Sequence, residues 1–350
     1  MSKALKNAIP KSHYEITLDF LNRVSGSFNE MANVIEQNCG TEPDFVKLGN
    51  YLSTTTSSSA SIENNTLYAN VMFHQYNMWQ AGSPIYYITP QLALELAKTE
   101  LNVDTDFLMS PFREIHVQIE PGLFSINDGE GSYPVIGFYV FFNRHESGLV
   151  EVRIMAGAII SIKDGFVDDT NFYYKLYLKP GKLKPMLKEY LDSITASNKQ
   201  EDLERFGGHR NIAHIEDFTY FVMNVLLYLT SKDPDIIKQL PVNFDDQIAG
   251  LKSAGKVKKL LRKKDKYTQR TINIVGPHYR LNTEEYNDMK NAGGIGGWKL
   301  KHKIKVSAHW RTQWYGSEKE GTRRSENIRI ESYTKGPDAA ELLTKKRIVK

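Results

Sequence analysis

Residues 135–142 (VIGFYVFF) form an almost unbroken run of β-branched and aromatic side chains. Such side chains fit a pleated, buried surface, and a short continuous apolar run of this length is typical of a strand inside a sheet. The sequence therefore predicts a buried central strand here, and the rest of the chain must supply the sheet around it.

Neighbouring segments predict the other strands of that sheet. Residues 115–119 alternate between apolar and polar side chains, and the turn-rich NDGEGSYP separates them from the central run. Three further short strands are expected at hairpin spacing, at residues 150–154, 158–162 and 172–178. The middle of the chain is thus expected to be an antiparallel sheet.

Apolar residues at helical spacing predict helices on both sides of this sheet segment. We expect one amphipathic helix from Tyr14 to Ile35, weakened in its middle by Gly26, and a loop at the polar run 53–61. Thr89 before Pro90 predicts a capped helix start. The remaining helices are expected at 67–79, 182–197 and 215–229. The fold class is therefore α+β, with a helical N-terminal part, a central antiparallel sheet with packed helices, and a small basic β-containing C-terminal module.

Charge divides the chain near position 250. Residues 251–350 carry 25 Lys and Arg against 10 Asp and Glu, a balance of +15, whereas residues 1–250 have a balance of −11. This asymmetry predicts two domains: an acidic body at 1–250 (helical over 1–105, sheet and helices over 106–250) and a basic module at 251–350. A basic end of this kind suits a polyanion, although the two parts can also neutralise each other across an interface.

Composition argues against several functional classes. No N-terminal apolar segment and no run of 18 apolar residues occurs, so we expect neither secretion nor a membrane span, and a cytoplasmic protein of a bacterial host cell. Cys39 is the single cysteine and cannot form an intramolecular disulfide. The segment HRNIAHIED at 209–217 has the wrong histidine spacing for a helical zinc site, so no metal and no cofactor is expected.

The basic C-terminal part combines cations with aromatic rings. Residues 252–270 hold nine Lys or Arg and predict a basic helix with a linker, and residues 299–306 alternate Lys with apolar residues as a strand does. RNA contact needs cations for phosphates and flat rings for unstacked bases. The predicted RNA-binding residues are Lys258, Lys259, Arg262, Lys263, Lys264, Lys301, Lys303, Lys305, His309, Trp310, Arg311, Trp314, Arg323 and Arg324. The alternative, that Trp298, Trp310 and Trp314 fill a core while the lysines are solvated, leaves the same pattern.

Two histidines in this part raise the alternative of a metal-independent ribonuclease. His302 and His309 lie among cations that stabilise a phosphorane-like transition state. They are an odd seven residues apart, however, and therefore on opposite faces of a continuous strand. We expect binding rather than catalysis, and no catalytic residue.

Several segments, in this order, make the chain similar to the second family of type V-A anti-CRISPR proteins, which come from phages and mobile elements. The most distinctive is a His-Trp pair with a second Trp four residues after the first and a nearby Gly. The segments are Trp79 with IYYITPQLALEL after it, Pro111 and Phe112 before HVQIE, IGFYVFF, LLYLTSKDPDI, INIVGPHYRL, and HWRTQWYG followed by IRIESYTKG. The family often has Pro-His just before its His-Trp pair, where this chain has Lys303 and Ile304, so His302 does not align with that histidine.

The resemblance implies a regulator that recognises the N-terminal peptide of a target during translation and brings about loss of its mRNA. We therefore expect the acidic body to bind a target polypeptide and the basic module to contact RNA or the ribosome. A phage structural or assembly protein remains a third alternative. The peptide-binding groove is expected near four aromatic residues, Trp79, Tyr86, Tyr87 and Phe112.

Overall fold

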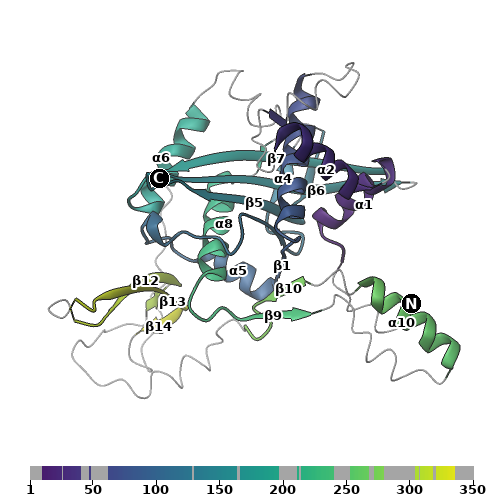
Figure 1. Cartoon of the computed structure of the whole chain (residues 1–350). Coiled ribbons are helices and arrows are strands. Elements are labelled where there is room, and N and C mark those ends of the chain that lie inside the picture. The colour runs from purple at the N-terminus through teal and green to yellow at the C-terminus, as the bar shows by residue number, and fades with distance from the viewer. Residues whose placement is uncertain are drawn as a thin grey trace.

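A mixed seven-stranded sheet forms the centre of the molecule in the computed structural model (Figure 1). The structure describes residues 10–25, 27–40, 47–48, 62–127, 130–163, 166–196, 211–212, 214–239, 253–267, 272–279, 304–306, 308–317 and 321–335. The strands of the central sheet are β1 (Ile85–Ile88), β2 (Glu114–Gln118), β5 (Gly137–Arg144), β6 (Val150–Lys163), β7 (Phe166–Leu178), β9 (Ile236–Gln239) and β10 (Ile272–Val275). Their spatial order is β7-β6-β5-β2-β1-β10-β9.

The antiparallel centre expected from the sequence is confirmed as the β2-β5-β6-β7 part of this sheet. The sheet is larger than expected, because β1 pairs in parallel with both β2 and β10, and β9 closes that side as an antiparallel edge strand. β10 comes from beyond position 250, so segments from both sides of that position build one sheet.

The separate strands expected at 150–154 and 158–162 are one strand, β6. The small residues Ala156, Gly157 and Ala158 resemble a break in the sequence, but β7 pairs with all three of them and β5 pairs with the first two. A Cβ atom on Gly157 would lie 2.6 Å from the imidazole of His13. The glycine thus serves close packing against a helix rather than a turn.

Helices cover both faces of the sheet. The helices in the described part of the chain are α1 (His13–Ser25), α2 (Phe28–Cys39), α4 (Ile62–Gln80), α5 (Pro90–Lys98), α6 (Leu183–Ala196), α8 (Ile215–Leu229) and α10 (Ala254–Tyr267), with a short 3-10 turn at Thr105–Phe107; α10 lies apart from the sheet. One core joins α5, α6 and α8 to one face, and two smaller clusters join α1, α2 and α4 to the other. None of the helices in the described part of the chain is long and apolar enough to cross a membrane.

The single helix expected from Tyr14 to Ile35 is two helices. The chain is extended at Ser27, and the backbone N–H of Phe28 donates to Asn22 Oδ1 at 2.8 Å. This break turns α2 back on α1, so that Leu21 and Phe28 enter the same apolar cluster. Helical periodicity alone did not predict this end of α1 at Ser25 and the new start of α2 at Phe28.

Smaller sheets complete the fold. One holds β3 (Ser125–Asn127), β4 (Ser132–Pro134) and β8 (Asn211–Ile212), and another pairs β11 (Ile304–Val306) with β14 (Tyr333–Lys335). A hairpin of β12 (His309–Tyr315) and β13 (Arg324–Ile330) extends away from the central sheet, and Figure 1 shows α10 on the other side of the molecule. The loop expected at residues 53–61 lies outside the described residues.

Candidate functional site

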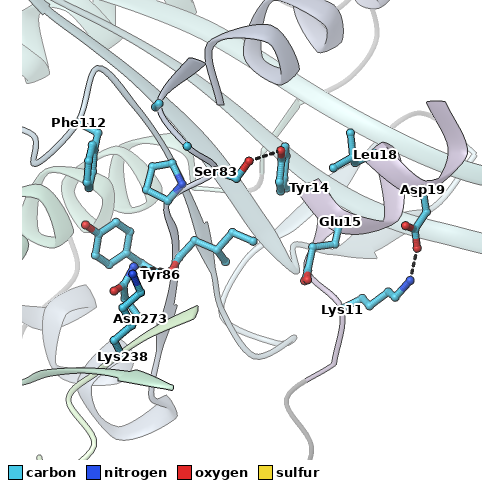
Figure 2. A pocket seen from close by; sticks show the side chains of 14 residues that line it. Lys11, Tyr14, Glu15, Leu18, Asp19, Ser83, Tyr86, Phe112, Lys238 and Asn273 are labelled. Carbon is cyan, nitrogen blue, oxygen red and sulfur yellow. Dashed lines mark hydrogen bonds and ion pairs between the residues drawn. The ribbon is translucent and has the colours of Figure 1, made fainter. Parts of the chain in front are cut away.

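A cavity of about 680 Å³ opens between α1 and the start of β1 (Figure 2). Two groups of side chains flank the segment 81–85 that runs through it. The first group comes from α1 and from Lys11, two residues before it, and the second comes from the sheet and the loop before β2. The lining residues are Lys11, Tyr14, Glu15, Leu18, Asp19, Ala81, Gly82, Ser83, Pro84, Ile85, Tyr86, Phe112, Lys238 and Asn273.

The sequence AGSP after α4 builds the centre of the cavity. The N–H of Ser83 donates to Met78 O at 2.7 Å and the N–H of Gly82 donates to Trp79 O at 3.1 Å. This is the hydrogen-bond pattern of a Schellman motif, with glycine in the left-handed conformation at φ +76°. Ser83 is also left-handed, at φ +57°, and its Oγ lies 2.6 Å from the hydroxyl of Tyr14. The helix end thus fixes Ser83 against α1.

A capping box positions the α1 wall. The backbone N–H of Ser12 donates to Glu15 Oε2 at 2.8 Å, and the N–H of Glu15 donates to Ser12 Oγ at 3.3 Å. This S-x-x-E arrangement satisfies two backbone donors at the helix start. Lys11 and Asp19 form an ion pair at the rim. The wall therefore presents carboxylates and one lysine on a defined helix end.

The opposite wall is a row across three strands. Tyr86 on β1 is in register with Asn273 on β10, and Asn273 is in register with Lys238 on β9. Residues in one row of a sheet project from the same face. Phe112, whose side chain is 45% exposed, lies close to Tyr86 in Figure 2. This wall offers two aromatic rings beside an amide and an ammonium group.

The tyrosines of the cavity stay protonated at neutral pH. Burial raises the pKa of Tyr86 to about 12, and burial also raises the pKa of Tyr14, although its hydrogen bond with Ser83 acts in the opposite direction. Both hydroxyls are therefore hydrogen-bond donors rather than anions. The cavity combines rings, neutral donors and both signs of charge, which suits a peptide better than a single small anion.

A buried polar layer lies behind Tyr14. The hydroxyl of Tyr139 accepts a hydrogen bond from Gln75 Nε2 at 2.9 Å and lies 3.3 Å from His13 Nδ1. The ring of His116 is fully buried against Tyr139, with centroids 4.7 Å apart, and neither of its nitrogens has a hydrogen-bond partner among the described residues. Burial, followed by the charge of His13, lowers the pKa of His116 well below the usual value, so its ring is neutral.

An adjacent buried pair joins α4 to β2. His74 Nδ1 lies 2.9 Å from Glu114 Oε1, and both side chains are almost wholly buried. Burial and then the charge of Arg153 lower the pKa of His74 to about 3, and burial raises the pKa of Glu114 well above its usual value. Both pKa shifts favour the neutral form of each group.

Two of the four predicted peptide-binding residues, Tyr86 and Phe112, line the cavity. Tyr87 lies on the opposite face of β1 and its hydroxyl donates to Glu120 Oε1 at 2.7 Å. Trp79 packs beside Tyr76 within the α2–α4 layer and donates from Nε1 to Asn29 Oδ1 at 2.8 Å. The α1 wall and the β9–β10 row were not predicted, because no local sequence pattern links residues so far apart in the chain.

The predicted RNA-binding residues that the structure describes lie on the β12–β13 hairpin, on α10 and on β11. Arg311, Trp314, Arg323 and Arg324 are exposed on the β12–β13 hairpin, where His309 is half-buried. Lys258 and Lys259 are exposed on α10, which also holds Arg262, Lys263 and Lys264. Lys305 is in β11, while Lys301 and Lys303, like His302 and Trp298, lie outside the described residues.

Trp310 belongs to the core rather than to this exposed set. Its side chain is 1% exposed, and its Nε1 donates to Asn224 Oδ1 at 2.8 Å. Asn224 in turn donates to the carbonyls of Leu96 and Thr99, so the tryptophan is tied to α5 and α8 together. A ring buried in this way cannot stack on a base. Of the two interpretations of the tryptophans, the core position therefore holds for Trp310, while Trp314 is 53% exposed.

Comparison with known protein families places the chain in one of them. The family model described as "Anti-CRISPR type V subtype A2 family" (AcrVA2-like) matches residues 86–331, more than half of the chain. The chain belongs to the anti-CRISPR type V subtype A2 family. The matched part contains the Tyr86–Phe112 side of the cavity and the hairpin, whereas α1 precedes it.

This AcrVA2-like chain is also similar to a solved structure entitled "Crystal structure of AcrVA2". The two share 12% sequence identity and a TM-score of 0.48, over 92% of this chain and 99% of the other. No curated protein matches the sequence. Within the described residues, no group of three or more His, Cys, Asp or Glu side chains is placed to hold a metal ion.

Proposed function

We propose that this anti-CRISPR family member lowers expression of its target by binding the target polypeptide, at the stage of the nascent chain, and RNA or the ribosome with the basic C-terminal part. The observation that carries the proposal is the cavity between α1 and β1. It brings predicted peptide contacts from β1 and the β2 loop together with charged side chains from α1 and β9.

Three features support an extended peptide as the ligand of the cavity. Its length exceeds one side chain, since its lining runs from α1 to the β9 edge strand. Phe112, which is 45% exposed, offers a ring surface to an apolar anchor, and Tyr86, which is 5% exposed, lines the cavity beside it. Glu15 and Asp19 on one side and Lys238 on the other offer charges for the amino group and side chains of a peptide.

The charge division supports the nucleic-acid half of the proposal. The balance of +15 after position 250 includes α10 and the exposed arginines of the hairpin, whereas the part before it has a balance of −11. An acidic body repels phosphates, so nucleic acid is directed to these basic elements and away from the cavity. The two binding activities can then operate at the same time.

The ribonuclease alternative rests on His309, the one of its two histidines that the structure describes. His309 begins β12 beside Ala308 and Trp310, both of which are buried. We expect His309→Gln to keep most RNA binding. If the wild type cleaves RNA without metal and His309→Gln abolishes that cleavage, the ribonuclease alternative is favoured instead.

Site-specific photocrosslinking tests the peptide half. A photoreactive phenylalanine analogue at position 112 of the full chain, in translating cells, is expected to crosslink to the N-terminal segments of a small set of polypeptides. Position 177 is the matched control, because Tyr177 is exposed to a similar degree, 41% against 45% for Phe112, and lies on β7. Equal crosslinking from both positions, or none from position 112, would contradict the proposal.

A further inference from the structure

The end of the β12–β13 hairpin carries two exposed aromatic rings. Seven residue pairs join the strands, from His309 and Ile330 at the base to Tyr315 and Arg324 at the end. Trp314 is 53% exposed and Tyr315 is 38% exposed. As neighbours on one strand they project from opposite faces of the hairpin.

The packing of β12 and the turn after it keep the Trp314 side chain exposed. Trp310 and Trp314 are four residues apart on β12 and therefore share a face, but Trp310 is anchored in the core through Asn224. Gly316, at φ +77°, turns the chain, and a Cβ atom there would clash with the carbonyl of Thr322. The N–H of Thr322 donates to Ser317 O at 3.0 Å. The hairpin is thus fixed to the core at Trp310 and closed by a turn after Gly316, which leaves Trp314 exposed to solvent.

Cations lie over both rings. The guanidinium of Arg323 is 4.3 Å from the centroid of the Trp314 ring. On the other face, Tyr315 has Arg324 at 5.9 Å and Lys232 at 5.8 Å. The Tyr315 face also holds Glu326, which pairs with Lys232 at 3.3 Å and with Arg324 at 3.7 Å. The cations of that face are therefore partly neutralised.

The Trp314 face carries no acidic side chain among the described hairpin residues. Beside Trp314 it presents Thr312, Ser325 and Asn327, which are uncharged, and Arg323 borders it at the turn. A flat ring, a guanidinium and short hydrogen-bonding side chains make up a surface that accepts an unstacked base and its phosphate. A duplex keeps its bases paired and offers this ring nothing to stack on.

We infer that the Trp314 face of the hairpin end binds single-stranded RNA, with a base stacked on Trp314 and Arg323 contacting the base or the adjacent phosphate. The inference rests on the proposed RNA contact of the C-terminal part and narrows it to one element and one form of RNA. The hairpin supplies preference for single strands, while α10 supplies charge without regard to strandedness.

Fluorescence anisotropy with the full-length protein tests this inference. The probes are a fluorescein-labelled oligoadenylate of about 12 nucleotides, within the site sizes of single-strand-binding modules, and the same strand annealed to oligouridylate. The wild type is expected to bind the single strand more tightly than the duplex. Trp314→Ala is expected to weaken single-strand binding about 5- to 150-fold, the range measured for one stacked base, with duplex binding unchanged. Trp314→Phe is expected to keep most of the single-strand affinity.

Tyr177→Ala is the matched control, since Tyr177 is an exposed ring with Lys175 5.5 Å from its centroid, outside the hairpin. It is expected to leave both affinities unchanged.

If Trp314→Ala binds both probes as the wild type does, the inference is wrong, and binding of both probes by the wild type still supports the broader RNA proposal. If the wild type binds neither probe at low salt, the RNA half of the proposed function fails with it. If Trp314→Ala keeps its RNA affinity but loses the polypeptides that crosslink to position 112, the hairpin binds a protein partner instead.

Discussion

Single buried side chains decide stability near the cavity, and His116 shows how. Its ring packs against Tyr139 and close to Gly137, where a Cβ atom would lie 2.7 Å from the imidazole. Burial keeps this ring neutral in the folded protein, whereas in the unfolded chain it takes up a proton below about pH 6.5. Stability from this group is therefore complete above that pH and is lost as the pH falls.

We expect the free energy of unfolding to fall as the pH is lowered from about 7 to about 5, with about 2 kcal/mol of this fall due to His116. His74, with its pKa of about 3, acts in the same direction over this window, whereas the raised pKa of Glu114 acts in the opposite one. His116→Leu removes two nitrogens that lack a hydrogen-bond partner in the described part of the chain, and it is expected to flatten the pH dependence. Urea unfolding at several pH values measures this, and an unchanged slope in the variant would contradict it.

Trp310 is expected to matter more than any one cation of the basic helix. Trp310→Ala should destabilise the protein by about 3 to 5 kcal/mol, because it empties a core site and leaves Asn224 Oδ1 without its donor. Lys263→Ala, on α10, should change stability and RNA affinity little, since neighbouring cations remain. Thermal unfolding of both variants compares them, and equal melting temperatures would count against the core position of Trp310.

At the scale of elements, one glycine joins β10 to α5. Gly276 has φ +74°, and a Cβ atom there would lie 2.6 Å from Leu92 Cδ2. Its carbonyl accepts from Thr89 Oγ1 at 2.9 Å, just before α5 begins. The close approach of strand and helix therefore requires both the left-handed backbone and the missing side chain.

Gly276→Ala is expected to cost about 2 to 5 kcal/mol, the sum of a strained backbone and overpacking against Leu92. Gly82→Ala is the matched control, because Gly82 has φ +76° but no described atom lies within 4 Å of where its Cβ would be. It should cost about 1 to 2 kcal/mol from the backbone alone. Denaturant unfolding of both variants separates the two causes, and equal losses would show that packing at Leu92 contributes nothing.

Strong local sequence patterns predicted individual helices and strands, but they did not predict which distant strands pair. The run 215–229 predicted α8 within its bounds, and VIGFYVFF predicted the buried strand β5, since burial on both faces leaves a continuous apolar signature. The parallel pairing of β1 with β10 joins segments about 190 residues apart, which no periodicity encodes. For the same reason the sequence indicated Tyr86 and Phe112 but not Tyr14, Lys238 or Asn273, which complete the cavity.

For the whole molecule, we propose that the opposite charges of residues 1–250 and 251–350 separate polypeptide binding from RNA contact. We expect RNA binding by the full chain to weaken by orders of magnitude over a modest rise in salt, because neutralised phosphates release counterions. Replacing Lys258 and Lys259 on α10 by Gln should reduce the slope of log affinity against log salt. Replacing Lys182 and Lys184, which border a second, smaller cavity in the acidic body, is the control. If filter binding shows the same change of slope for both double variants, RNA contact is not confined to the basic C-terminal part.

We propose that one molecule of this protein connects a polypeptide to the RNA that encodes it. Full-length protein with the photoreactive residue at position 112 is isolated from translating cells, the crosslinked polypeptides are identified by mass spectrometry, and the co-purifying RNA is sequenced. We predict that the enriched RNA contains the messages for the crosslinked polypeptides, and that Trp314→Ala reduces their recovery while Tyr177→Ala does not. Enriched RNA unrelated to the crosslinked polypeptides would contradict this connection.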